Sequence, residues 1–483
     1  MQVLEQFIYP IILLANIVLA AVLIFMERRN IGSTWAWLMV LLFLPVLGFL
    51  LYLVFGQKLT KRKLYKLQEG EFSHYNTAVA RQMQLLEDGA LHVHEPAMEK
   101  HRDMIYMNVV SDGALYTQNN NVRIFTEGQA LFADMLAEIE RAKEHVHLLY
   151  YIYRKDDLGR RMLELLTAKA SQGVEVRVLY DAVGSSEISP RFFRPLLQAG
   201  GQAVPFFPSK IPLVNFRVNF RNHRKLTIVD GRVGYVGGFN IGNEYLGQDK
   251  KIGYWRDTHL KISGNAVNML QARFFLDWNL SSPNRMQESS HYFPECGEVT
   301  DGIGVQIVSS GPNSEKQQIK YALLKMIYKA KKKIYLQTPY FIPDESFLTA
   351  LRMAAMSGVD VRVMIPGVPD SKMVHWASHS YLGDVLKSGV RCFLYEKGFM
   401  HAKTIAVDTE LASVGTANVD IRSFKLNFET NAFLYDTKLA REVEEQFLFD
   451  QDQCREMTIE LYQNRPVHSR IMESLTRLLS PIL

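Results

Sequence analysis

The chain of 483 residues is longer than one ordinary domain, and its hydrophobic fraction of 48% is sufficient for more than one buried core. Its formal net charge is only +5, with no block of five or six like charges, so composition gives no argument for a nucleic-acid-binding protein. The three cysteines, Cys296, Cys392 and Cys454, lie far apart and fit neither a disulfide framework nor a Cys-x-x-Cys metal site.

Two long apolar segments lie near the start of the chain. Phe7 to Met26 and Thr34 to Phe55 are uncharged runs of 20 and 22 residues, and a helix needs about 20 apolar residues to cross a hydrocarbon core of roughly 30 Å. A secretory signal peptide would begin with a basic region, whereas this chain carries Glu5 and no Lys or Arg before the first run. The sequence therefore predicts a transmembrane helical hairpin over residues 1–57. Two buried helices of a soluble protein are the less favoured alternative.

The distribution of basic residues around these segments predicts an orientation. The short loop between them holds Arg28 and Arg29, whereas five basic residues follow the second segment: Lys58, Lys61, Arg62, Lys63 and Lys66. Because positive charge is enriched on the cytoplasmic side of membrane segments, the large remaining part of the chain is expected in the cytoplasm. Residues 58–110 are charged, rich in Gln and weakly periodic, which predicts a helical connector.

From residue 111 onwards the sequence repeats itself. Gly173–Asp181 resembles Gly358–Pro366, and both read as a buried strand that follows an amphipathic helix. Three further pairs share an offset of 178 residues: His223 with His401, Gly237 with Gly415, and Asn240 with Asn418. The sequence therefore predicts two tandem α/β units, residues 111–290 and 291–483, each with a largely parallel or mixed sheet covered by helices.

Each unit carries a His-x-Lys-x4-Asp motif on a predicted strand. The motif residues are His223, Lys225 and Asp230 in the first unit and His401, Lys403 and Asp408 in the second. The spacing of two places the His and Lys on one face of a strand. An imidazole can attack phosphorus or carry a proton, while the ammonium beside it holds a non-bridging oxygen. The pattern thus indicates a site for phosphoryl chemistry.

Glycine and asparagine follow each motif. We expect Asn240 and Asn418 to donate amide N–H groups to phosphate oxygens, and the preceding Gly237 and Gly415 to let the backbone come close to a ligand. The two motif aspartates are counted with the catalytic set, although their positions at strand ends favour a role in fixing the local fold.

A nucleophilic imidazole needs an acceptor for its second ring nitrogen. Asp257 and Glu429 lie shortly beyond the two asparagines, and their carboxylates are the candidates to orient His223 and His401. A lone His or Lys on a strand is usually an ordinary polar position, but two copies with matching Gly and Asn residues favour the catalytic interpretation.

Two other features carry less weight. His375 and His379 have a spacing that can bind zinc, but no third ligand follows, so no metal site is predicted. The stretch Phe206–Arg221 mixes aromatic and basic residues. It fits a lipid headgroup boundary and a buried strand equally well.

The paired motifs with their trailing Gly and Asn resemble the phospholipase D superfamily, and the chain is similar to bacterial cardiolipin synthases over nearly its whole length. The segments that carry the second similarity are Ala36–Leu38, Leu44–Gly48, Gln337–Phe341 and Arg422–Phe424, with Asn427 and Glu429. The resemblance implies two tandem phospholipase D-like α/β sandwich domains related by pseudo-twofold symmetry, with one active site built from both motifs.

The resemblance also implies a reaction. Such enzymes join two phosphatidylglycerol molecules into cardiolipin and release glycerol without a metal or other cofactor, so we expect a multi-pass protein of the bacterial cell membrane whose partners are these lipids and not nucleic acid. The mechanism would pass through a phosphatidyl-histidine. A phospholipase D hydrolase, with water as the second nucleophile, remains the alternative. A nuclease is disfavoured by the weak net charge, and a non-catalytic scaffold by the two intact motifs.

Overall fold

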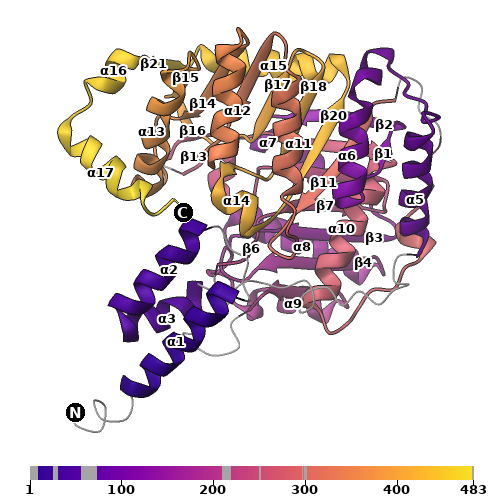
Figure 1. The fold of residues 1–483 in the computed structure, drawn as a ribbon. Coiled ribbons are helices and arrows are strands. Elements are labelled where there is room, and N and C mark those ends of the chain that lie inside the picture. The colour runs from indigo at the N-terminus through magenta and orange to yellow at the C-terminus, as the bar shows by residue number, and fades with distance from the viewer. Residues whose placement is uncertain are drawn as a thin grey trace.

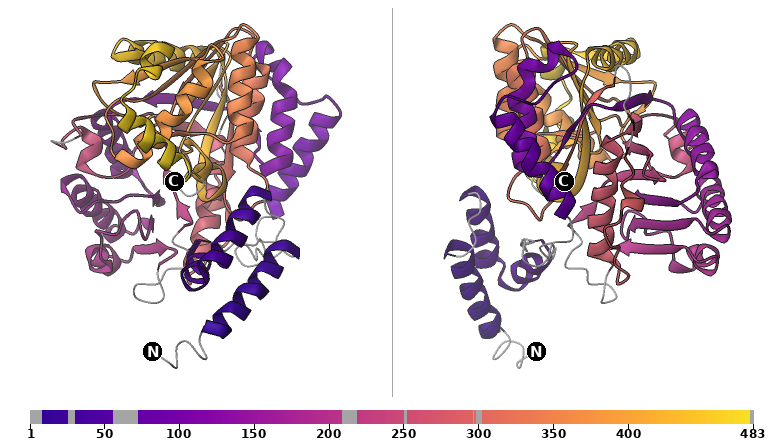
Figure 2. Two further views of the ribbon diagram at one scale, coloured as in Figure 1. Left: turned by 60° about the vertical axis from the view of Figure 1, so that its left-hand side comes forward. Right: turned by 90° about the vertical axis from the view of Figure 1, so that its right-hand side faces the viewer.

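Two mixed β-sheets, one from each half of the chain, form the body of the protein (Figure 1). The computed structural model describes residues 9–25, 31–55, 73–208, 219–249, 252–295, 297 and 302–480. Helices cover the outer faces of both sheets, and three N-terminal helices extend away from the body (Figures 1 and 2).

The first sheet has the strand order β2-β10-β8-β7-β3-β4-β5. Its strands are β2 (Asn120–Phe125), β3 (His145–Tyr150), β4 (Glu175–Asp181), β5 (Gln202–Phe206), β7 (Lys225–Val229), β8 (Val233–Gly237) and β10 (His259–Gly264). Strands β3, β4 and β5 are parallel, and the other pairs are antiparallel. The parallel strands are joined through helices α8 (Asp157–Ser171) and α9 (Arg194–Gln198), which is the connection that parallel pairing requires.

The second sheet repeats this order as β11-β20-β18-β17-β12-β14-β15 and extends it with β1 at one edge and β21 at the other. The strands are β1 (Tyr116–Thr117), β11 (Gly304–Ser310), β12 (Lys333–Gln337), β14 (Asp360–Pro366), β15 (Arg391–Tyr395), β17 (Thr404–Val407), β18 (Leu411–Gly415), β20 (Asn427–Tyr435) and β21 (Cys454–Met457). The mixed α/β architecture expected from the sequence repeat is thereby confirmed.

Three large hydrophobic cores hold these layers together. Helix α7 (Gly128–Arg141) packs with α8 and α9 on the outer face of the first sheet. Helices α11 (Gln318–Lys329), α12 (Glu345–Met356) and α13 (Lys372–Leu386) do so on the second. The third core combines both sheets with α10 (Ala266–Ser281) and α15 (Thr437–Gln451). The two halves therefore share a continuous apolar interface.

The described part of the predicted connector packs against the second half. It forms α5 (Ser73–Glu87), a 3₁₀ turn, η2 (Pro96–His101), and α6 (Arg102–Asp112). Met104 and Ile105 of α6 belong to the core of the second sheet, and β1, which follows α6, pairs with β11. The segment before the first sheet thus completes the second one. Residues 56–72 lie outside the described residues.

The N-terminal apolar segments form three helices, whereas the sequence predicted two. They are α1 (Tyr9–Phe25), α2 (Ile31–Phe43) and α3 (Pro45–Phe55). Pro45 has no N–H to donate to the carbonyl of Leu41, so the second segment breaks there. The Asn16 side chain donates instead, to the carbonyl oxygens of Leu41 at 3.3 Å and of Pro45 at 2.9 Å.

This break bears on the predicted transmembrane hairpin. In the parts of residues 1–57 that the structure describes, and in the rest of the described chain, no helix combines the length and the apolar character needed to cross a membrane. The two spanning helices predicted from hydropathy are therefore not supported, and for the second one the proline at position 45 supplies the physical reason.

Candidate active site

The first motif is attached to the second half of the chain by a short parallel ladder. Strand β6 (Arg221–Asn222) pairs with the start of β20, so that Asn222 lies opposite Phe428. The next residue, His223, donates its backbone N–H to the carbonyl of Phe428 at 2.9 Å. The first histidine is thus held beside Glu429.

The second motif is attached to the first half in the same way. Strand β16 (Gly398–Met400) pairs in parallel with β9 (Tyr254–Arg256), and Met400 lies opposite Arg256. His401 then donates its backbone N–H to the carbonyl of Arg256 at 2.7 Å. This places the second histidine beside Asp257.

The two carboxylates that the sequence singled out therefore serve the histidine of the opposite half. Both oxygens of Glu429 lie 3.0 Å from Nδ1 of His223, and Oδ2 of Asp257 lies 2.5 Å from Nδ1 of His401. An ionised carboxylate only accepts hydrogen bonds, so each Nδ1 carries the proton and Nε2 keeps the lone pair. Both imidazoles are in the tautomer that a nucleophile or a base needs.

The surroundings of the two carboxylates differ. Glu429 also accepts hydrogen bonds from Oγ1 of Thr416 at 2.6 Å and Nδ2 of Asn427 at 3.1 Å. Asp257 accepts one from the backbone N–H of Thr258 at 2.7 Å. Gly238 stands where the second half has Thr416, and a Cβ there would lie 1.9 Å from Oδ1 of Asp257. The two carboxylates thus differ in the hydrogen bonds that they accept.

Burial sets the protonation of the histidines. It lowers the pKa of His223 to about 4 and that of His401 to about 3, and the nearby lysines act in the same direction, while the carboxylates oppose them. Burial raises the pKa of Glu429 and of Asp257, but their cationic and imidazole neighbours outweigh it and hold both pKa values below the ordinary value. At neutral pH the resting site has two charged carboxylates and two neutral imidazoles.

The two motif lysines are buried beside their histidines. Nζ of Lys225 donates to the backbone carbonyl of His223 at 2.7 Å, and Nζ of Lys403 donates to that of His401. Burial lowers the pKa of Lys225 to about 7 and that of Lys403 to about 8. When both are protonated, their charges balance those of the two carboxylates.

A cavity of about 460 Å³ lies between the halves, and His223, His401, Asn240 and Asn418 all line it. Its other charged residues are Arg221, Arg422, Asp370 and Asp420, and its aromatic residues are Tyr151, Tyr245, Trp255 and Tyr340. The cavity combines two imidazoles with cationic and anionic groups, which suits a substrate that has both a phosphate and free hydroxyl groups.

The two asparagines are partly engaged by the protein. Oδ1 of Asn240 accepts from the backbone of Ile152 at 3.0 Å, and its Nδ2 donates to the hydroxyl of Tyr245 at 3.2 Å. Nδ2 of Asn418 donates to Asp420 at 3.0 Å. Because an amide nitrogen carries two hydrogens, each asparagine retains one N–H that a phosphate oxygen can accept.

The motif aspartates are not brought to the cavity. The carboxylate of Asp230 accepts the backbone N–H groups of residues 143–145, and that of Asp408 accepts those of residues 331–333. These turns precede β3 and β12, at the ends of the strands away from the histidines. The hydrogen bonds are those of residues that fix the local fold.

The glycines before the asparagines have a packing role. A Cβ on Gly237 would lie 2.4 Å from Cα of His259 in β10, and one on Gly415 would lie 2.3 Å from the side chain of Asn431 in β20. These glycines permit close packing of neighbouring strands. That they also let the backbone come close to a ligand stays a prediction.

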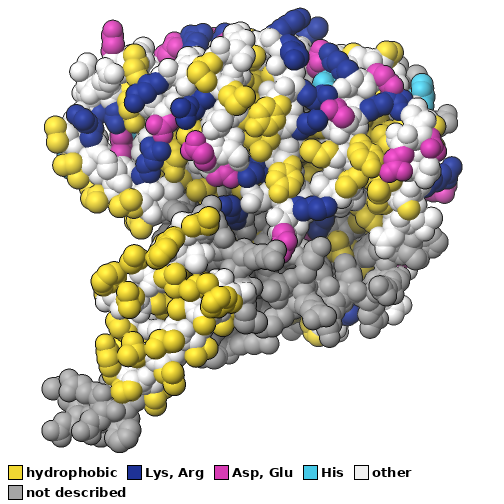
Figure 3. All heavy atoms as spheres, viewed as in Figure 1, with side chains coloured by type: hydrophobic (Ala, Val, Ile, Leu, Met, Phe, Trp, Pro, Cys, Tyr) yellow, Lys and Arg dark blue, Asp and Glu magenta, His cyan; other side chains and the backbone are white. Residues whose placement is uncertain are grey.

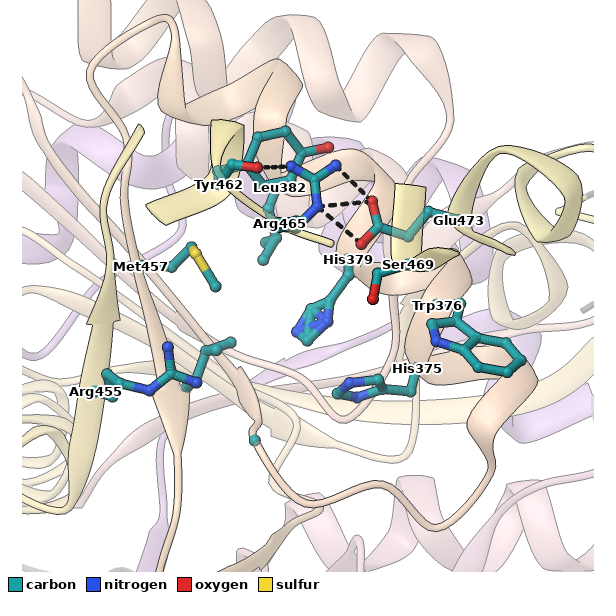
Figure 4. A pocket seen from close by; sticks show the side chains of 12 residues that line it. His375, Trp376, His379, Leu382, Arg455, Met457, Tyr462, Arg465, Ser469 and Glu473 are labelled. Carbon is teal, nitrogen blue, oxygen red and sulfur yellow. Dashed lines mark hydrogen bonds and ion pairs between the residues drawn. The ribbon is translucent and has the colours of Figure 1, made fainter. Parts of the chain in front are cut away.

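Potential metal ligands lie outside this cavity. Ligand atoms of Glu144, His145 and His291 are within 4.8 Å of one another. His145 is the first residue of β3, whereas the cavity residue Tyr151 follows the last one, so this group lies at the far end of the strand. His375 and His379 line a second cavity of about 210 Å³ (Figure 4), and no third ligand groups with them in the described part of the chain.

Sequence reasoning missed the aromatic residues that contact the histidines. The ring of Tyr151 is 4.8 Å from that of His223, and the ring of Trp255 is 5.1 Å from that of His401. Tyr151 follows directly after β3, whose last residue pairs with Lys225. An aromatic residue at the end of a strand that pairs with the motif strand was therefore the signal that could have identified it. Of the stretch Phe206–Arg221, residues 209–218 lie outside the described residues, and Phe206 and Phe207 are core residues.

Comparisons with known proteins identify the family. The family description "Cardiolipin synthase, PLD-like domain" matches residues 135–271 and 323–451, and "Phospholipase_D-nuclease N-terminal" matches residues 14–57. The chain is 50% identical to a cardiolipin synthase of Listeria innocua over 99% of each chain. It is 49% identical to the major cardiolipin synthase of Bacillus subtilis over 97% of each.

A solved structure supports the fold alone. The phosphatidylserine synthase of Haemophilus influenzae superposes with a TM-score of 0.61 at 14% identity, over 79% of this chain and all of that one. Two phospholipase D-like halves around one pair of histidines define a class of phosphodiester-transfer proteins. Within that class, the chain belongs to the cardiolipin synthase family.

Proposed function

We propose that this member of the family transfers a phosphatidyl group from one phosphatidylglycerol to another, giving cardiolipin and glycerol. The observation that supports the proposal is the pair of neutral imidazoles at one cavity, each with Nδ1 bound by a carboxylate and Nε2 available to substrate. One imidazole then serves as the nucleophile and the other as the acid and base.

In the first step, Nε2 of His223 attacks the phosphorus of phosphatidylglycerol. A nitrogen–phosphorus bond forms, the phosphorus–oxygen bond to the headgroup glycerol breaks, and His401 gives its proton to the departing alkoxide. His401 is neutral in the resting site, so it must acquire this proton. The two carboxylates and two ammonium groups of the site already balance in charge. The bound phosphodiester adds a negative charge, which favours the protonated form of His401.

In the second step, His401 acts as the base. Its Nε2 takes the proton from the primary hydroxyl of a second phosphatidylglycerol, and this oxygen attacks the phosphorus while the nitrogen–phosphorus bond breaks. His223 leaves as a neutral imidazole, and His401 again carries the proton with which the cycle began. Lys225, Lys403, Asn240 and Asn418 stabilise the phosphoryl oxygens in both steps.

The roles of the two histidines differ in this proposal, with His223 as the nucleophile and His401 as the acid and base. Glu429 accepts hydrogen bonds from His223, Thr416 and Asn427, whereas His401 is the one side chain that donates to Asp257 within the described residues. Asp257 can therefore stabilise the imidazolium that forms when His401 takes up a proton.

The charged rim of the cavity can sort the parts of the substrate. Arg221 and Arg422 are placed to attract the anionic headgroup. On the acidic side, the hydroxyl of Tyr340 donates to Oδ2 of Asp370 at 2.5 Å, and Asp370 and Asp420 offer acceptors for the glycerol hydroxyl groups.

We place this reaction at the bacterial cell membrane, with the catalytic body on the cytoplasmic side. Helices α1 to α3 expose large apolar side chains, among them Ile11, Leu14, Leu42 and Leu47, and burying them in the bilayer would remove them from water. The basic residues that follow the second apolar segment support the orientation.

The products formed from one lipid test the function. Purified protein is given phosphatidylglycerol labelled in the headgroup glycerol, with the variants His223→Ala and His401→Ala as inactive controls. We expect cardiolipin and one equivalent of free glycerol. Phosphatidic acid in place of cardiolipin would identify the hydrolase alternative, in which water resolves the intermediate.

A further inference from the structure

The last helix of the described chain, α17 (Val467–Arg477), turns its apolar side chains outward. Val467, Ile471, Leu475 and the following Leu478 are 68%, 54%, 54% and 76% exposed. They recur at intervals of three and four residues and therefore form one stripe along the helix. In Figure 3 apolar side chains of this region lie along the edge of the body above the N-terminal helices.

Some polar side chains of this region turn inward. Glu473 and Thr476 of α17, and Ser480 just beyond it, are buried, whereas His468, Arg470, Ser474 and Arg477 are exposed. Figure 4 shows Ser469 and Glu473 at the second cavity, where the carboxylate of Glu473 accepts hydrogen bonds from two nitrogens of Arg465, the shortest at 2.6 Å. The hydroxyl of Ser480 bonds to that of Tyr381 of α13 at 3.0 Å.

An ordinary helix on a protein surface in water packs its apolar stripe on the core. In α17 the inward side carries Glu473 and Thr476 instead, and the apolar stripe stays exposed. A contiguous exposed apolar stripe marks an interaction surface.

The charges next to the stripe identify its partner. Arg470 and Arg477 border it, with Arg477 paired to Asp384 of α13 at 2.7 Å, and the one acidic residue of α17, Glu473, is turned inward and paired with Arg465. An apolar stripe with a basic border is the pattern of helices that lie in the headgroup region of anionic membranes. The sequence beyond the described residues, Pro481-Ile482-Leu483, continues this apolar character.

We infer that α17 lies in the surface of an anionic phospholipid bilayer, with Val467, Ile471 and Leu475 among the acyl chains. This is a second membrane contact, separate from α1 to α3. It rests on the proposed function in one respect, namely that the substrate is drawn from the same bilayer.

The contact has a consequence for the catalytic cavity. Helix α17 packs against α13, and α13 contributes Val374 to the wall of the catalytic cavity and His375 and His379 to the second cavity. In this inference, bilayer binding by α17 holds α13, and with it this part of the cavity wall, near the membrane surface. We expect it to raise the apparent affinity for lipid in bilayers, and to leave the chemical step unchanged.

Photo-crosslinking tests the contact without reference to turnover. The full chain is reconstituted in nanodiscs of phosphatidylglycerol and phosphatidylethanolamine, with p-benzoylphenylalanine in place of Ile471. The matched control carries it in place of Met356, which is 66% exposed at the end of α12. We expect crosslinking of radiolabelled phospholipid at position 471 to exceed that at position 356 by at least tenfold. Equal lipid labelling at the two positions would overturn the inference, and a crosslinked dimer of the chain would assign the stripe to self-association instead.

Charge substitution provides the second measurement. Ile471→Asp with Leu475→Asp should raise the apparent KM for phosphatidylglycerol in bilayers about tenfold and leave the rate on detergent-dispersed lipid within twofold, and Met356→Asp should change neither. An unchanged bilayer KM in the double variant would contradict the inference. A loss of rate on dispersed lipid with a lowered thermal midpoint would show a structural role for the stripe, and would overturn it too. Cardiolipin formation by the unmodified chain, measured in the same nanodiscs, tests the proposed function separately.

Discussion

Glu429 in the second half of the chain holds His223 in the first, with both carboxylate oxygens 3.0 Å from Nδ1 of the imidazole. Asp257 and His401 make the reciprocal contact at 2.5 Å. Each histidine is therefore paired with a carboxylate that its own half does not contain, so the candidate site is assembled at the interface between the two halves.

The first prediction concerns this orientation. Glu429→Gln keeps the size of the side chain but removes the charge that fixes the Nδ1 proton of His223. We expect kcat for cardiolipin formation to fall by about 10²–10⁴-fold, because the imidazole of His223 is no longer held in the tautomer that it needs. KM should change little, because the contacts that bind the lipid are retained. Asp257→Asn should have a comparable effect through His401. Initial rates over a range of phosphatidylglycerol concentrations measure both.

A matched control is available on the surface. Glu456 pairs with Arg391 at 2.9 Å in an exposed position, and Glu456→Gln should leave kcat within twofold. If Glu429→Gln kept more than half of the wild-type rate, the orienting role of this carboxylate would be wrong.

The second prediction separates the duties of the histidines. His223→Ala should abolish the covalent intermediate, whereas His401→Ala should slow its resolution. Protein incubated with phosphorus-labelled phosphatidylglycerol is denatured in alkali, because phosphohistidine is acid-labile, and is then mapped. Label on the peptide that contains His401 would reverse the assignment. Label on neither peptide, together with inversion at phosphorus, would mean direct displacement.

The repeated architecture could be predicted from the sequence because it is encoded locally. The shared offset of 178 residues and the alternation of strand and helix patterns indicated two α/β units, and the structure has two sheets of matching strand order. The histidines, lysines and asparagines were found for the same reason, since each lies in a short motif that occurs twice.

The relationships between distant segments could not be predicted in this way. Nothing in the sequence near His223 indicates that its partner lies 206 residues away, because this pairing depends on the ladder between β6 and β20. The break at Pro45 was missed for a different reason. A hydropathy window counts Pro45 only by its apolar character. Proline has no backbone N–H to donate within a helix, and α2 ends just before it, at Phe43.

The third prediction is a fall in activity in alkaline solution. Burial lowers the pKa of Lys225 to about 7 and that of Lys403 to about 8, so their ammonium charge is present at lower pH and lost as the pH rises through these values. The charge stabilises the phosphoryl oxygens, and kcat/KM should therefore decrease from about pH 7 upwards. A profile from pH 5 to 10 measures the effect. Lys225→Arg should remove one of the two steps, and a flat profile up to pH 10 would show that lysine charge is not required.

The fourth prediction concerns stability at the interface between the halves. Nη1 of Arg224 lies 2.6 Å from Oδ2 of Asp277, and both side chains are almost fully buried. Asp277→Asn would leave a buried guanidinium without its counter-charge, which typically costs about 3–5 kcal/mol. Thermal unfolding in detergent should show a clear decrease of the midpoint. Arg391→Gln, which breaks the exposed pair with Glu456, should cost less than about 1 kcal/mol, and equal effects of the two changes would contradict the prediction.

The fifth prediction is that a chain without residues 1–57 folds but acts poorly on bilayers. The helices of this segment have their own small core of Leu23, Leu41 and Tyr52, which is separate from the cores of the body, so the thermal midpoint should change little. Activity on detergent-dispersed phosphatidylglycerol should stay within twofold of the full chain. On bilayers the rate should fall by about 10- to 100-fold, because the segment no longer concentrates the enzyme at its substrate. Assays of both proteins on vesicles and on mixed micelles, at equal protein concentration, measure the ratio. A bilayer rate equal to that of the full chain would show that the N-terminal helices do not anchor the enzyme.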